Sequence, residues 1–240
     1  MLPNLPRMSA VFLDVDGTLV PYAASPGAVH VDPELIPHLE KLAAKLGGAL
    51  ALLSGRRLEN LDELFAPLAL PAAGLHGLQR RDAAGRPHSA ASAAAALAAV
   101  RGPLQALVDS NPGLRLEDKI ETFAVHFQSA PERGPLVLAR MNEALALLGP
   151  SFQVQPGRMV YEIKSRLCNK GTALRAFLQE APFIGRTPVM IGDDLTDLDA
   201  FHAAEAVGGY AIAVGSLVSA RWQVSNPEEL RRWIARLAES

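Results

Sequence analysis

Two acidic stretches near opposite ends of this 240-residue chain constrain its fold more than any other feature. Residues 14–18 read Asp-Val-Asp-Gly-Thr, and residues 193–197 read Asp-Asp-Leu-Thr-Asp. Each stretch directly follows an apolar run, which is the pattern of acidic groups held at the carboxyl end of a buried parallel strand. Open α/β sheets bind their ligands at that edge, so the two stretches are candidates for one site.

Strands and helices alternate at both ends of the chain. Near the start, periodicity predicts strand 10–15, helix 33–46, strand 48–53 and helix 57–65. From Lys170 onward it predicts helix 170–180, strand 188–192, helix 195–204, strand 210–214 and a last helix from about Pro227. This alternation is typical of a parallel sheet with helices on its faces.

The middle of the chain follows a different pattern. Residues 80–88 are polar and rich in turn formers, and Ser89 is the expected cap of an alanine-rich helix. Residues 122–127 and 159–163 alternate as half-buried strands do, with a helical pattern over 134–148 between them. These features predict a separate α+β module.

Four short motifs occur in a fixed order along the chain. They are Asp14 with Asp16, Ser54, Lys170, and Asp193 with Asp194. Over residues 10–215 this series resembles the haloacid dehalogenase superfamily of phosphohydrolases. The resemblance implies an α/β fold, with a Rossmann-like core on a parallel sheet and an inserted α+β cap domain of that superfamily's second cap type. We expect the core to span residues 1–80 and 165–240 and the cap to span residues 81–164.

The resemblance also implies a role for each core motif. Asp14 is expected to be the nucleophile that carries an aspartyl phosphate, and Asp16 the general acid and base. Ser54 is expected to donate a hydrogen bond to the transferring group, whose charge Lys170 offsets. Thr18 is expected to brace the loop.

A metal ion is expected beside these aspartates, because a phosphate dianion approaches several carboxylates only when positive charge is supplied. The resemblance implies Mg²⁺, held by the Asp14 carboxylate, the Asp16 backbone carbonyl and the Asp193 carboxylate. Asp194 and Asp197 are expected to hold metal-bound waters or to orient Lys170.

Further segments extend this series, namely Leu53 to Arg56, His76-Gly77, Glu117 to Lys119 with His126, Gly157 to Glu162 followed by Asn169 to Gly171, and Gly192 to Asp197 with Asp199 to Phe201. They resemble the bacterial trehalose-6-phosphate phosphatases, which implies hydrolysis of that sugar phosphate. The residues expected to bind substrate are Gly55, Arg56, His76, Gly77, Glu117, Lys119, His126, Arg158 and Glu162. The resemblance implies that Glu117, Lys119 and Glu162 hold the glucose unit remote from the phosphate, and charged groups suit this role since they bind hydroxyls in fixed directions.

Several positions depart from the usual pattern of those enzymes, namely Leu75, Phe127-Gln128, Arg158 and Leu198. None belongs to the expected catalytic set, but they leave open a phosphatase for another sugar phosphate, such as a glycosylglycerate or sucrose phosphate. A phosphomutase also stays open, as does a non-catalytic phosphosugar-binding protein, because a fold alone does not fix a function.

Composition argues against several other classes. The net charge is −2, without a basic stripe, so nucleic acid is not an expected partner. The chain has no apolar run of about 18 residues, and so no expected membrane span. Its six histidines lack the H-E-x-x-H spacing of zinc sites.

Compartment and assembly are expectations of the same kind. Cys168 is the only cysteine, and the first nine residues lack the apolar segment of a secretory signal, so we expect a cytoplasmic protein. We also expect a monomer that takes a small phosphosugar substrate. The resemblance admits a functional link to a trehalose-6-phosphate synthase.

Overall fold

The computed structural model describes residues 2–22, 29–89 and 94–240 of the chain. Its contacts divide the chain into two compact units. Met1–His88 with Asn169–Ser240 is called here the core unit, and Ser89–Cys168 is called the cap unit. The first boundary falls later than the expected position near residue 80, because residues 79–81 and 87–89 add strands to the sheet of the core unit.

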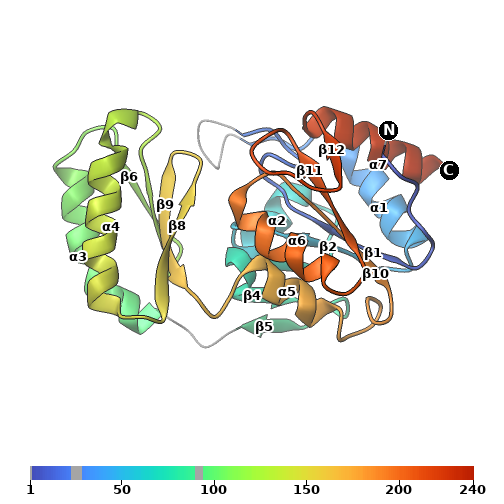
Figure 1. The fold of residues 1–240 in the computed structure, drawn as a ribbon, viewed down its shortest axis with the longest axis horizontal. Coiled ribbons are helices and arrows are strands. Elements are labelled where there is room, and N and C mark those ends of the chain that lie inside the picture. Colours follow the sequence, from blue (N-terminus) through green and yellow to red (C-terminus); the bar gives the residue numbers. More distant parts are fainter. Residues whose placement is uncertain (1, 23–28, 90–93) are drawn as a thin grey trace. The chain divides into compact units, whose positions relative to one another are not determined.

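An eight-stranded sheet forms the centre of the core unit (Figure 1). Its order is β12 (Trp222–Val224), β11 (Tyr210–Val214), β10 (Thr187–Gly192), β1 (Ser9–Leu13), β2 (Leu50–Leu53), β3 (Ala72–Gly74), β4 (Gln79–Arg81) and β5 (Pro87–Ser89). Neighbours from β12 to β3 are parallel, and β4 is antiparallel to β3. Every residue of β1 and β2 is buried, which explains why these strands are continuous apolar runs.

Among the described residues, five α-helices pack on this sheet. They are α1 (Leu35–Lys45), α2 (Leu58–Phe65), α5 (Lys170–Phe177), α6 (Leu198–Glu205) and α7 (Pro227–Glu239). In the packing, α1 lies against α7 and α5 lies against α6 (Figure 1). Side chains such as Leu39 of α1 and Trp233 of α7 enter one continuous apolar core.

Three phenylalanines join α5 to the central strand. Phe12 lies in β1, Phe177 ends α5, and Phe183 follows in the next loop. Their ring centroids are 5.1 to 6.0 Å apart, within the range of favourable aromatic pairs. The cluster therefore packs α5, which begins at Lys170, against β1, which leads directly to Asp14.

The strand register brings three predicted motifs to one edge of the sheet. Strand β1 lies between β10 and β2, and Leu13 pairs with both Ile191 and Leu52. The carboxyl ends of β10, β1 and β2 therefore meet at one edge. From β1 the sheet is extended on one side by β2 and β3 and on the other side by β10 and β11, and open α/β sheets bind ligands where the strand order reverses in this way.

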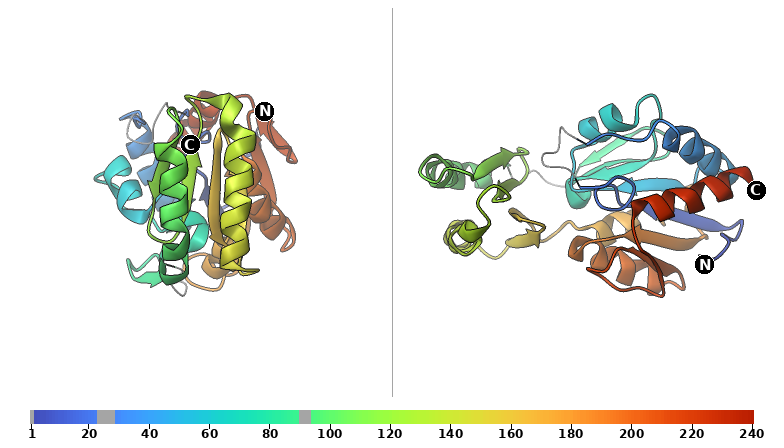
Figure 2. Two further views of the ribbon diagram at one scale, coloured as in Figure 1. Left: turned by 90° about the vertical axis from the view of Figure 1, so that its left-hand side faces the viewer. Right: turned by 90° about the horizontal axis from the view of Figure 1, so that it is seen from above.

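The cap unit is an antiparallel sheet covered on one face by two helices. The strand order is β6 (Arg115–Asp118), β7 (Phe123–His126), β9 (Val160–Ser165) and β8 (Phe152–Gly157). Figures 1 and 2 show α3 (Ala94–Asp109) and α4 (Gly134–Leu148) side by side on the same face. Val125 and Ile163 point toward these helices and join the apolar core of the cap unit.

The α/β core on a parallel sheet is confirmed, and most expected elements occur within a few residues of their predicted bounds. Strand β8 was missed, because Gln153, Gln155 and Pro156 interrupt its apolar pattern. Ser89 is the last residue of β5, and because residues 90–93 lie outside the described part, its expected role as a helix cap stays a prediction. None of the helices in the described ranges combines the length and hydropathy needed to cross a membrane.

Gly171 should tolerate no side chain, because α5 and α6 approach closely there. A Cβ at residue 171 would lie 2.3 Å from the carbonyl oxygen of Asp199. We expect Gly171→Ala to lower the free energy of unfolding by about 1–3 kcal/mol, the usual cost of overpacking, as measured by urea denaturation. The control Arg175→Ala, at an exposed position of the same helix, should change it by less than about 0.5 kcal/mol. Equal stability of the two variants would contradict the close approach.

Candidate active site

Three buried polar residues stand at the ends of adjacent strands, and a fourth begins a helix. Asp14 follows β1, Ser54 follows β2 and Asp193 follows β10, and all three are buried. Lys170 is the first residue of α5, directly after the Asn169 cap, whose side chain accepts a hydrogen bond from the backbone of Thr172. Local structure thus places the four predicted motifs at one edge of the sheet.

Lys170 lies between two carboxylates. Its Nζ donates to Oδ1 of Asp14 and to Oδ1 of Asp197, each at 2.6 Å, and only 3% of its side chain is exposed. Burial disfavours the charge of Lys170, but the two carboxylates outweigh burial and raise its pKa above the ordinary value. The lysine is therefore a fixed positive charge.

The 193–197 turn fixes Asp197 and uses Asp194 as a cap. Oδ2 of Asp197 accepts the backbone N–H groups of Asp193 and Asp194, each at 3.0 Å. The Asp194 carboxylate accepts the N–H of Leu195 at 2.6 Å. Both oxygens of Asp197 are thus engaged within the protein, which suits a residue that orients Lys170.

The acidic cluster of Asp14, Asp193 and Asp197 fits a divalent cation. Their carboxylate oxygens lie within 4.8 Å of one another, and all three side chains are buried. Burial raises the pKa of Asp14, with a further contribution from the charge of Asp197. Burial and the nearby Asp14 raise the pKa of Asp193 to about 8. One lysine does not balance three buried carboxylates, and hard oxygen donors are the ligands of such cations.

Asp193 is also held by two hydroxyl groups. Thr18 Oγ1 donates to its Oδ1 and the Tyr22 hydroxyl donates to its Oδ2, each at 3.0 Å. Thr18 was predicted to brace the loop. Tyr22 was missed, because nothing in its sequence context indicates that the loop folds back onto Asp193.

Asp16 and Arg56 form a bidentate ion pair. Arg56 Nε donates to Oδ2 of Asp16 and its Nη2 donates to Oδ1, both at 2.7 Å. The backbone N–H of Arg56 also donates to Ser54 Oγ at 3.1 Å, so the Ser54 hydroxyl keeps its own proton for donation elsewhere. Arg56, expected to contact substrate, here contacts the expected acid and base.

The His76-Gly77 turn packs on the 54–56 loop. Leu75, His76 and Gly77 have successive φ values of 49°, 55° and 105°. The N–H groups of Leu75 and His76 donate to backbone carbonyls of the loop at 2.8 and 2.9 Å. A Cβ at residue 55 would lie 2.8 Å from Nε2 of His76, so a side chain at the predicted Gly55 would displace the His76 ring. The turn therefore buttresses the loop that carries Ser54.

Three of the predicted sugar-binding residues lie on one face of the cap sheet. Glu117 of β6 and Glu162 of β9 both pair with Ala124 of β7, so they flank this small residue at one level of the sheet. His126 lies two residues beyond Ala124 on that face. It is the face opposite to the one that packs against α3 and α4.

Hydrogen bonds and ion pairs order this polar face. Lys119 Nζ lies 3.3 Å from Oε1 of Glu162, which also accepts a 2.6 Å hydrogen bond from Thr122 Oγ1. His126 Nε2 lies 2.8 Å from Oε2 of Glu117. The sequence did not predict Thr122 as a partner of Glu162. Only the position of Thr122 directly before β7, the neighbour of β9, could have indicated this contact.

Arg158 is exposed in the turn between β8 and β9. It lies beside Met159, whose carbonyl accepts the N–H of Phe127 at 2.9 Å. The turn adjoins the His126 end of β7.

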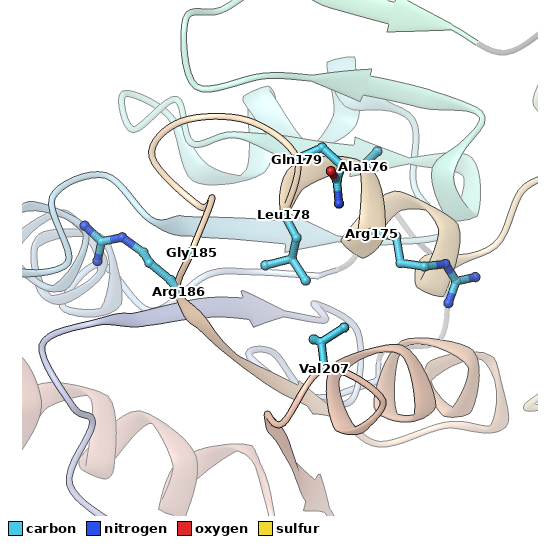
Figure 3. A pocket seen from close by; sticks show the side chains of 7 residues that line it. All are labelled: Arg175, Ala176, Leu178, Gln179, Gly185, Arg186 and Val207. Atoms are coloured by element: carbon cyan, nitrogen blue, oxygen red, sulfur yellow. The ribbon is translucent and has the colours of Figure 1, made fainter.

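A surface depression of about 540 Å³ lies away from the acidic cluster (Figure 3). Its lining includes Leu178, Arg186 and Val207. Gly185 and Arg186 precede the six-residue strand β10, whereas Asp193 follows it. At 3.3 Å per residue the strand separates the two places by roughly 20 Å, so this depression is not part of the candidate site.

Comparison with known proteins agrees with this arrangement. A family model described as trehalose-phosphatase matches residues 12–231. The chain belongs to the trehalose-phosphatase family. It is similar to a probable trehalose-phosphate phosphatase of Sinorhizobium fredii, with 44% identity over 95% of this chain and 87% of that protein. It is also similar to the trehalose-6-phosphate phosphatase of Escherichia coli, with 37% identity over 97% of this chain and 87% of that protein.

Solved structures place this trehalose-phosphatase family member in the same fold class. The C-terminal domain of trehalose-6-phosphate phosphatase from C. albicans aligns with a TM-score of 0.87 and 19% identity, covering 97% of this chain and 93% of that one. A trehalose-6-phosphate phosphatase related protein aligns with a TM-score of 0.80 and 25% identity, covering 95% and 96%. The expected phosphatase family and its fold are thus confirmed.

Removal of the Lys170 ammonium should destabilise the fold, because two buried carboxylates lose their shared positive partner. Lys170→Met leaves the Asp14 and Asp197 carboxylates without their shared partner. We expect it to lower the free energy of unfolding by about 3–5 kcal/mol, the cost of breaking a buried ion pair, as measured by urea denaturation in a chelator. Lys41→Met, at an exposed position of α1, is the matched control. A Lys170→Met variant as stable as the control would show that the carboxylates need no cationic partner.

Proposed function

We propose that this chain hydrolyses trehalose 6-phosphate to trehalose and phosphate through an aspartyl phosphate. The observation that carries the proposal is the buried contact of Lys170 Nζ with Asp14 and Asp197, 2.6 Å from an oxygen of each. It lies beside the acidic cluster, whose carboxylate oxygens are close enough together to hold one cation. The family assignment and its named relatives support the choice of substrate.

In the first step, an oxygen of Asp14 attacks phosphorus and the bond from phosphorus to the sugar oxygen breaks. Asp16 must be protonated for this step, whereas its pairing with Arg56 through both oxygens is that of the ionised form. Its proton goes to the departing oxygen, so that trehalose leaves as a neutral alcohol. Lys170 and the Ser54 hydroxyl offset the charge on the transferring group. The fixed position of Lys170 supports this role, because no reorganisation is needed when the charge develops.

In the second step, water attacks phosphorus and the bond from phosphorus to Asp14 breaks. Asp16, now ionised, takes the proton from the attacking water. Arg56 holds Asp16 through two hydrogen bonds, which fixes the orientation of the carboxylate. The products are free phosphate and the original enzyme.

Mg²⁺ is the proposed cofactor, held by the Asp14 carboxylate, the Asp16 backbone carbonyl and the Asp193 carboxylate. When bound, Mg²⁺ supplies the positive charge that lets a phosphate dianion approach these carboxylates. Asp197 keeps Lys170 in place, and Thr18 orients Asp193. Asp194 is proposed to hold a metal-bound water.

The polar face of the cap unit is proposed to recognise the sugar. Glu117, Lys119 and Glu162 bind the glucose unit remote from the phosphate, with His126 and Arg158 alongside. The ion pair of Lys119 with Glu162 supports this, since it presents a donor and an acceptor in fixed directions. In the core unit, the loop of Gly55 and Arg56 and the turn of His76 and Gly77 are proposed to border the phosphate.

Assembly and location complete the proposal. We propose a cytoplasmic monomer, functionally linked to a trehalose-6-phosphate synthase that supplies its substrate. The single cysteine of the chain supports a reducing compartment.

Phosphate release from trehalose 6-phosphate tests the reaction. The purified chain should release phosphate with Mg²⁺, lose activity in a chelator and regain it when Mg²⁺ is restored. Asp14→Asn should abolish release because an amide is a poor nucleophile, and Asp16→Asn should lower it by about 10²- to 10⁴-fold. Asp109→Asn, an exposed carboxylate at the end of α3, should keep full activity. Activity that survives chelation or Asp14→Asn would contradict the mechanism.

Substrate preference tests the role of the cap unit. Alanine at Glu117, Lys119 or Glu162 should lower kcat/KM for trehalose 6-phosphate by orders of magnitude, because binding energy from a remote sugar assists the chemical step. It should barely change hydrolysis of p-nitrophenyl phosphate. Glu143→Ala, exposed on α4, is the control and should affect neither substrate.

A panel of phosphosugars, including sucrose phosphate and a glycosylglycerate phosphate, completes that assay. Equal losses on both substrates would mean general damage to the fold. Preference for another member of the panel, or no loss on trehalose 6-phosphate, would overturn the assignment of the disaccharide.

A further inference from the structure

The Asp193 carboxylate receives a hydrogen bond on each of its oxygens. Thr18 Oγ1 donates to Oδ1 and the Tyr22 hydroxyl donates to Oδ2, both at 3.0 Å. A carboxylate offers about four lone-pair sites, so each oxygen retains capacity for a further partner. With a donor fixed on each side, however, the carboxylate is not free to rotate.

The place of the Tyr22 ring is set by the backbone of Gly17. This glycine has a φ of 88°, and its N–H donates to the carbonyl of Val20 at 2.7 Å, which folds the loop back on itself. A Cβ at residue 17 would lie 2.1 Å from Oδ2 of Asp193 and 2.5 Å from Cε2 of Tyr22. The Tyr22 ring and the Asp193 carboxylate therefore both pack against Gly17, in the space that a side chain at this position would fill.

We propose that the Tyr22 hydroxyl is a positioning group that holds Asp193 as a one-oxygen ligand and so favours Mg²⁺ over Ca²⁺. The inference rests on the proposed function only in taking the acidic cluster as a cation site. It assigns to a residue outside the recognised motifs the choice of which cation that site prefers.

The preference follows from the different demands of the two ions. Mg²⁺ requires a nearly ideal octahedron of ligands, to which a carboxylate usually contributes one oxygen. Ca²⁺ accepts six to eight oxygens in a flexible arrangement and often takes both oxygens of a carboxylate. A carboxylate pinned by Thr18 and Tyr22 suits the first ion, whereas one released by loss of the Tyr22 donor can turn toward the second.

A merely structural role for Tyr22 makes a different prediction. Tyr22 is 39% exposed, so most of its surface packs against the protein, including Gly17. If packing were its only role, loss of the hydroxyl would leave the ratio of the two cation affinities unchanged. The ratio is therefore the readout that separates positioning from packing.

Calorimetric titration of the metal-free chain with Mg²⁺ and with Ca²⁺ tests the proposal without any substrate. We expect Tyr22→Phe to weaken Mg²⁺ binding by about tenfold, the lower range for loss of a partner that orients a ligand, and to lower the ratio of Mg²⁺ to Ca²⁺ affinity. Tyr22→Ile, which removes the ring as well, should lower this ratio at least as far. The control is Tyr210→Phe, whose buried hydroxyl has no hydrogen-bond partner among the described residues, and it should change neither affinity.

An unchanged ratio, or equal weakening of both cations, would overturn the proposal. Failure of the wild-type chain to bind either cation would overturn it as well. A chain that binds Mg²⁺ but does not hydrolyse trehalose 6-phosphate would overturn the proposed substrate and leave this inference standing, because no step of the titration depends on turnover.

Discussion

The ammonium of Lys170, held at 2.6 Å from both Asp14 and Asp197, is the interaction on which the rest of the site depends. Three carboxylates buried together would repel one another, and burial alone disfavours their charged forms. The lysine offsets part of that cost and ties the first residue of α5 to the end of β1. The remaining negative charge is what makes the cluster a fit for a divalent cation and, through it, for a phosphate.

Apolar packing supplies the rigidity that this polar contact requires. The Phe12, Phe177 and Phe183 rings hold α5 on β1, and Gly171 lets α5 approach the start of α6. Both contacts lie outside the polar cluster, yet they set the position of the lysine. A phosphoryl group stabilised by charges that are already in place costs no rearrangement during the reaction, which is how such a site gains its rate.

The sequence predicted the positions of the motifs but not the partners of every side chain. Aspartates after apolar runs had to meet at one edge of a parallel sheet, so Asp14 and Asp193 could be placed together before the structure was known. The Arg56 pairing with Asp16 and the Tyr22 contact with Asp193 join residues from different loops, whose paths no periodicity records. Short strands such as β8 were missed for a related reason, since cross-strand pairing rather than its own pattern stabilises such a strand.

The identity of the phosphorylated residue tests the account most directly. Asp16→Asn lacks the base for the second step, whereas p-nitrophenolate needs no acid to leave in the first, so this variant should accumulate the intermediate when mixed with p-nitrophenyl phosphate and quenched in acid. Mass spectrometry of its peptides should find a hydroxylamine-labile phosphoryl group on Asp14, and a variant that also carries Asp14→Asn should show none. A phosphoryl group on Ser54, or phosphorylation that persists without the Asp14 carboxylate, would contradict the account.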